Sequence, residues 1–113
     1  MMTGKFLGML FQSRDIMHLA HLNTTSFAEH KALNGYYDSI LDLADKFAEV
    51  YFGRVKRVDI IVPESKIIGA VEHLKEMQQL LDGERNNYTT ELQNIIDEML
   101  ALVNKTLYLL TLV

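Results

Sequence analysis

A chain of 113 residues is long enough for one domain and too short for two. It has no cysteine, which excludes disulfides and thiolate chemistry. Its formal net charge of -4 and the lack of a basic tail argue against nucleic acid as a partner. No apolar run approaches the roughly 20 residues that cross a bilayer. We therefore expect a single cytoplasmic domain over residues 1–113, without membrane contact.

Apolar residues at helical spacing predict a first helix over residues 5–22. Ser26, with Glu29 three positions later, has the pattern of a capping box that begins a second helix over residues 27–52. Apolar residues of this second helix recur at alternating steps of four and three, which is typical of a helix that packs in a bundle. The positions of this apolar seam are Leu33, Tyr37, Ile40, Ala44, Phe47 and Tyr51.

Residues 54–63 are the expected long connection, rich in β-branched residues that favour extended backbone or a short strand. About ten extended residues reach roughly 33 Å, enough to run back along a helix of about 20 residues. We therefore expect parallel second and third helices joined by a crossover, as in a ferritin-like four-helix bundle. The third helix is predicted over residues 64–81 and the fourth from Asn87 or Thr89. Their predicted inward residues are Ile67, Val71, Leu74 and Leu81, then Leu92, Ile96, Met99, Val103, Thr106 and Leu110.

Four acidic residues of the second helix follow one stripe, nearly opposite the apolar seam. A solvated face is one interpretation, and a bound cation or basic partner that relieves like-charge repulsion is the other. His21 and His30 flank the turn between the first two helices, and they would be close if that turn is tight. Carboxylates and imidazoles together suit ferrous iron, with open positions that admit oxygen. The acidic stripe consists of Asp38, Asp42, Asp45 and Glu49.

Three stretches resemble the Dps branch of the ferritin-like family. The segment 21–30, His-Leu-Asn-Thr-Thr-Ser-Phe-Ala-Glu-His, is similar to a signature in which H-W-N-V leads through a short loop to F-x-x-x-H. The run 45–49, Asp-Lys-Phe-Ala-Glu, is similar to D-x-x-A-E, and residues 105–110 resemble the end of the last helix. The chain also looks like short ferritin-like proteins of tailed phages, which places it in a bacterial or phage-infected cell.

The resemblance implies a ferroxidase centre at a two-fold interface between subunits. Its metal ligands would be His21 and His30 of one subunit, with Asp45 and Glu49 of its neighbour. The implied cofactor is iron, or another divalent metal, or none if the site is degenerate. The implied assembly is a homo-oligomer, at least a two-fold dimer and at most a larger shell.

Two other functions stay open. A non-catalytic oligomeric helical protein that binds a protein partner or a small ligand would explain the short chain and the missing tryptophan after His21. The other is a nucleoid-associated protein. Such a protein would need to bind DNA strongly, and the net negative charge of this chain argues against that. Whether the protein is an enzyme therefore stays open as well.

Arg54, Lys56 and Arg57 form a basic cluster that could pair with an acidic surface or bind a phosphate.

Overall fold

The computed structural model describes residues 1–113 and consists of helices, without a strand. This confirms the predicted all-helical bundle. A three-residue 3-10 helix, η1 (Arg85–Asn87), links the last two long helices. The four long helices are α1 (Thr3–Asn23), α2 (Phe27–Arg54), α3 (Ala70–Glu84) and α4 (Thr90–Leu110).

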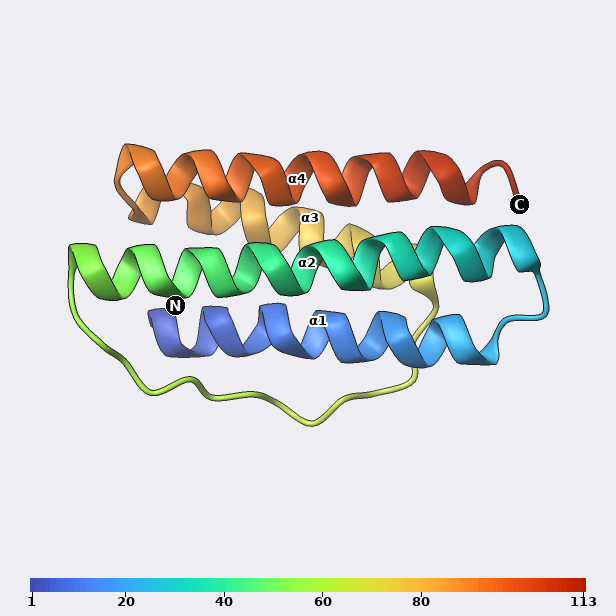
Figure 1. The fold of residues 1–113 in the computed structure, drawn as a ribbon, viewed down its shortest axis with the longest axis horizontal. Coiled ribbons are helices and arrows are strands. Elements are labelled where there is room, and N and C mark those ends of the chain that lie inside the picture. Colours follow the sequence, from blue (N-terminus) through green and yellow to red (C-terminus); the bar gives the residue numbers. More distant parts are fainter.

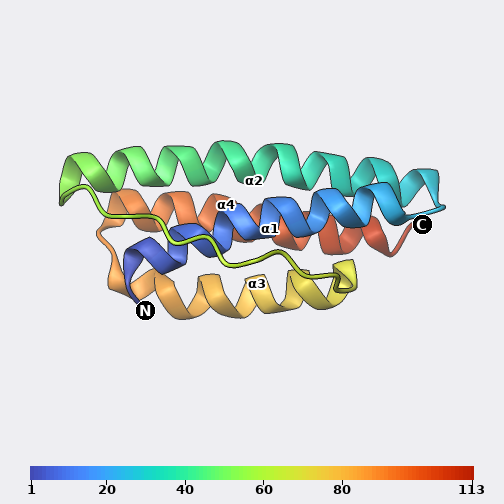
Figure 2. The same ribbon diagram turned by 90° about the horizontal axis from the view of Figure 1, so that it is seen from below.

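The four long helices lie side by side, and α2 runs parallel to α3 (Figure 1). α1 and α4 run in the opposite direction, so that the α1–α2 turn, the start of α3 and the end of α4 share one end of the bundle. Residues 55–69, here called the connection, return along the whole length of the bundle from the end of α2 to the start of α3. Seen from below, the connection follows α1 on its outer side (Figure 2).

Local sequence signals explain how α2 and α4 form. The Ser26 side chain accepts a hydrogen bond from the backbone N–H of Glu29 at 3.2 Å, so the predicted N-cap begins α2. All six predicted inward residues of α4 are buried, which confirms its amphipathic pattern. In the apolar seam of α2, Leu33, Ile40, Ala44 and Phe47 are fully buried. The fully buried tyrosine is Tyr36, whereas Tyr37 is only half-buried.

The predicted start of the third helix was wrong. α3 begins at Ala70 instead of Glu64, and Ile67 and Val71 are 89% and 45% exposed instead of inward. The reason is distance: α2 has 28 residues, so it is roughly 42 Å long and ten extended residues do not span it. Residues 64–69 are therefore not helical and complete the crossover.

The connection lies directly against α1 at two glycines. A Cβ at Gly4 would overlap the carbonyl oxygen of Asp59, and one at Gly8 would overlap that of Ile61. The Ile61 N–H donates to the Gly4 carbonyl at 3.1 Å, and the Gln12 side chain donates to the Glu64 carbonyl at 2.7 Å. Gly4, Gly8 and Gln12, which follow one another at one helical turn along α1, thus hold the connection. The connection therefore packs against α1 and does not pair with a second strand.

Candidate functional site

His21 and His30 meet across the α1–α2 turn. Their rings stack with centroids 3.5 Å apart and planes 21° apart. Nδ1 of His21 donates to the carbonyl of His30 at 2.6 Å, and Nδ1 of His30 donates to the carbonyl of His21 at 2.8 Å. The His21 carbonyl is one of the last four of α1, which have no partner within the helix, so the His30 side chain satisfies it, and the two Nε2 atoms keep their lone pairs. We call these two residues the turn histidine pair.

Aromatic and cationic groups extend this arrangement along the α1–α2 face. The ring of His18 stacks on Tyr37 at 4.3 Å, and the guanidinium of Arg14 lies 5.7 Å from the Tyr37 centroid. The Tyr37 hydroxyl donates to Asn34 at 2.7 Å. These ring and guanidinium contacts join α1 and α2, although Nε of Arg14 is buried without a hydrogen-bond partner.

The turn histidine pair does not converge on one metal ion in this conformation. A metal binds imidazole in the plane of its ring, at about 2.0–2.1 Å from the nitrogen. Two nearly parallel rings that are stacked 3.5 Å apart cannot both have one ion in their planes at that distance. One chain therefore offers two separate imidazole ligands at this turn.

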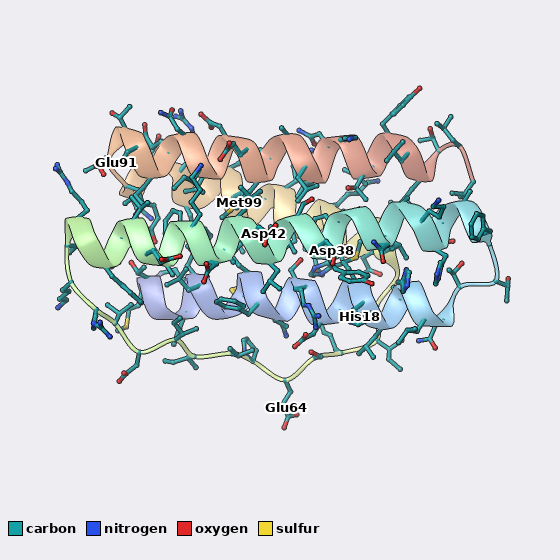
Figure 3. All side chains as sticks on the ribbon, viewed as in Figure 1. His18, Asp38, Asp42, Glu64, Glu91 and Met99 are labelled. Atoms are coloured by element: carbon teal, nitrogen blue, oxygen red, sulfur yellow. The ribbon has the colours of Figure 1, made fainter.

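The predicted carboxylate ligands lie elsewhere on α2. Asp45 is fifteen residues after His30, which is roughly 22 Å along the helix. All four residues of the acidic stripe are exposed, and Figure 3 shows Asp38 and Asp42 on the outer side of α2 and His18 on α1. A hydrogen bond with Asp45, and then the Asp45 charge, raise the pKa of Glu49 above its ordinary value. No group of three or more potential metal-ligating side chains lies together in the chain. The four predicted ligands thus form two pairs, and a site that joins them across two subunits stays a prediction.

A polar group that the sequence analysis missed lies inside the bundle. The Ser13 hydroxyl is 2.7 Å from the Tyr36 hydroxyl and 2.7 Å from Nε2 of His73. Burial lowers the pKa of His73 to about 4 and raises that of Tyr36. Nδ1 of His73 has no hydrogen-bond partner. The available signal was Ser13, a polar residue at helical spacing between Leu10 and Met17.

This core polar network, formed by Ser13, Tyr36 and His73, has a serine–histidine contact of the kind that activates nucleophiles. Ser13 and Tyr36 are fully buried, and His73 is 3% exposed. No substrate atom can therefore reach the Ser13 hydroxyl in this structure. The network links α1, α2 and α3 through hydrogen bonds, and so it contributes to the packing of these three helices.

Large apolar side chains are exposed around the α1–α2 turn and the start of α3. Two of them, Leu19 and Ile67, line a groove of about 340 Å³ between α1, the connection and α3. The groove walls include Ile16, Ala20 and Ile68, and Glu29 lies at its rim. We define the apolar end by five residues that are 41% to 89% exposed, which are Leu19, Leu22, Phe27, Ile67 and Val71.

Sequence comparison places the chain in a family. Residues 21–110 match a family of unknown function, DUF5856, and the chain belongs to that family. It is 29% identical over 114 residues to an uncharacterised 14.6 kDa protein of Enterobacteria phage T4 from the mobD-ri intergenic region. The match covers 97% of this chain and 88% of the phage protein. No solved structure matches the chain.

This family assignment corrects the resemblance to the Dps branch, which was wrong. The matched residues include all three stretches on which the resemblance rested, and they belong to DUF5856. A physical reason is that these stretches are common products of helical geometry. A polar turn between two histidines, followed by acids at i and i+4 on an exposed face, also arises in a plain helical hairpin.

None of the helices has the length and apolar character that a membrane crossing requires.

Proposed function

We propose that this protein is a non-catalytic helical bundle that acts by self-association, with the apolar end as its contact surface. The observation that carries the proposal is that five exposed large apolar side chains lie at one end of the bundle, and two of them, Leu19 and Ile67, line a groove there. Contiguous exposed apolar surface on a small domain commonly marks a protein interface. Burial of this surface would also add stability to a chain whose own core is modest.

The charge distribution favours a second copy of the chain at this end. The formal net charge of -4 makes copies repel one another, most strongly where the acidic stripe would face another stripe. Around the apolar end the charges are mixed: Lys31 lies over Phe27, and Lys66 pairs with Glu76 at 3.9 Å. Two such surfaces related by a two-fold axis can therefore meet without strong repulsion.

The experiment is sedimentation velocity over a concentration series, with far-ultraviolet circular dichroism to check folding. We expect the unmodified chain to dimerise or form a larger assembly. Phe27→Glu and Ile67→Glu should each weaken association roughly tenfold or more, because each buries an unpaired carboxylate in the contact. Val55→Glu is the matched control, since Val55 is 56% exposed at the other end of the bundle.

A monomeric unmodified chain over the whole concentration range would refute self-association. Equal weakening by Val55→Glu would show that added negative charge, and not the apolar end, controls assembly. The similarity to a phage T4 protein supports a phage-infected cell as the setting in which the protein acts.

Divalent-metal binding between copies is the second candidate. Its support is the turn histidine pair, in which both Nδ1 atoms donate to carbonyls and both Nε2 atoms remain available. Asp45 and Glu49 of a second copy would supply the carboxylates. Equilibrium dialysis with Zn²⁺ and Fe²⁺ tests this, comparing the unmodified chain with His30→Asn and Asp45→Asn. Metal retention that is unchanged in both variants would refute the site.

The ferritin-like description of the architecture is likewise a proposal, and it concerns connectivity alone. One long crossover between parallel α2 and α3 is the feature that supports it, since up-down-up-down bundles have none. Comparison of an experimental structure with such bundles would test it.

A further inference from the structure

A second cavity is lined by residues of the start of α1, the end of α2 and the connection. The start of α1 and the end of α2 lie at the other end of the bundle (Figure 1). This cavity has a volume of about 520 Å³. Three cationic side chains line it, Lys5 from α1 and Lys56 and Arg57 from the start of the connection. Asp59 is the one carboxylate in the lining. The local charge is therefore positive in a chain whose net charge is negative.

These three cations have no ion-pair partner. The five ion pairs of the structure involve Arg14, Lys46, Arg54, Lys66 and Arg85. Arg54 is the informative contrast, because it belongs to the same basic cluster but lies 3.9 Å from Glu91 on α4. Cations that line one cavity and form no ion pair, even with Asp59 in the same lining, are suited to a phosphate, which accepts several charge-assisted hydrogen bonds.

A smaller cavity of about 270 Å³ adjoins the first and shares Thr3 and Tyr51 with it. Its walls are largely aromatic and aliphatic, with Tyr51, Tyr88, Val55 and Leu92. The Tyr51 and Tyr88 rings stand 6.1 Å apart at 82°, and the Tyr88 hydroxyl is 3.2 Å from the Thr3 hydroxyl. The side chain of Tyr88 is thus held in place, while Asn87 adds a polar amide beside an apolar wall.

We propose that the two cavities together bind a nucleotide. Lys5, Lys56 and Arg57 hold its phosphate in the larger cavity, and the base lies against Tyr51, Tyr88 and Val55 in the smaller one. A cationic pocket next to an aromatic wall matches the two chemically different halves of a nucleotide. The start of α1 has no side-chain cap and faces the same end, so its dipole adds attraction for the phosphate.

The test is isothermal titration calorimetry of the full chain with AMP, adenosine and inorganic phosphate. We expect saturable AMP binding that is tighter than phosphate binding, and little binding of adenosine. Lys56→Ala and Arg57→Ala should each weaken AMP binding roughly tenfold, since each removes a charge-assisted contact. Both residues are exposed in the connection, so neither variant should unfold the bundle.

Arg54→Ala is the matched control, because it removes an equal charge from the same basic cluster at a residue that does not line the cavity. This variant should leave AMP binding unchanged. Equal loss in Arg54→Ala would show nonspecific attraction to positive charge and overturn the site. Equal affinity for AMP and inorganic phosphate would overturn the nucleotide assignment. Absence of saturable AMP binding would overturn the whole proposal, and it would leave self-association at the apolar end unaffected.

Discussion

The core polar network and the turn histidine pair place histidines of one small bundle in two different environments. His73 lies inside the bundle, with Nε2 bonded to Ser13 and Nδ1 without a partner. His21 and His30 lie at the helix turn, where each Nδ1 has a backbone carbonyl as acceptor. His21 is nearly as buried as His73, at 7% against 3% exposed, whereas His30 is half-buried. The comparison teaches that the two regions differ in hydrogen bonding, because the turn supplies an acceptor for each Nδ1 and the core leaves Nδ1 of His73 without one. Burial lowers the pKa of His73 because the charged ring cannot be solvated.

The largest expected effect is the response of His73 to acid. Its pKa is about 4 in the folded chain and about 6.5 when unfolded, so the unfolded state takes up the proton first as the pH falls. The stability that the neutral His73 ring allows the folded chain to keep is fully present above about pH 6.5, and it is lost as the pH falls toward 4. At about 1.4 kcal/mol per pH unit, the free energy of unfolding should fall by about 3 kcal/mol. Urea unfolding at closely spaced pH values measures it.

His73→Gln is the control for this prediction, because glutamine is similar in length and stays neutral at every pH. The variant should be less stable at pH 7 but should lose much less stability between pH 6.5 and 4.5. If its pH dependence equals that of the unmodified chain, another group is responsible, and the first part of the comparison fails.

Removal of the central hydroxyl of the core polar network should have the next largest effect. Ser13→Ala leaves both the Tyr36 hydroxyl and Nε2 of His73 without a partner, which should cost about 2 kcal/mol. Tyr36→Phe removes one outer hydroxyl and preserves the contact between Ser13 and His73, so it should cost only about 1 kcal/mol. Chemical denaturation at pH 7 gives both values. A larger loss for Tyr36→Phe would mean that the tyrosine hydroxyl, and not Ser13, organises the network.

The smallest effect is expected at the turn histidine pair. His30→Ala should cost about 1 kcal/mol, because water can replace the lost contacts at a half-buried turn. His30→Asn keeps an amide donor near the position of Nδ1 and should recover part of that loss. Thermal unfolding gives the stabilities, and hydrogen exchange of residues 21–30 shows whether the turn opens locally. A loss as large as that of Ser13→Ala would remove the contrast between the two regions.

Much of the fold could be predicted from the sequence, because local chemistry decides it. The N-cap at Ser26 and the inward residues of α4 follow from side-chain hydrogen bonding and helical periodicity, and the structure confirms both. The start of α3 could not be predicted in this way. It depends on how far the connection must travel, and that distance is set by the length of a different helix.

For the candidate sites, the sequence by itself determined which chemical groups are available: two histidines beside a turn, a line of carboxylates and a basic cluster. Tertiary structure alone decided how these groups combine. It stacked His21 on His30 and brought Lys5 to Lys56 and Arg57 across more than fifty residues. Contacts between residues far apart in the chain depend on helix packing and on the path of the connection, and neither has a local signature. Gly4 and Gly8 show this most directly, because only the connection against α1 reveals why a side chain cannot fit there.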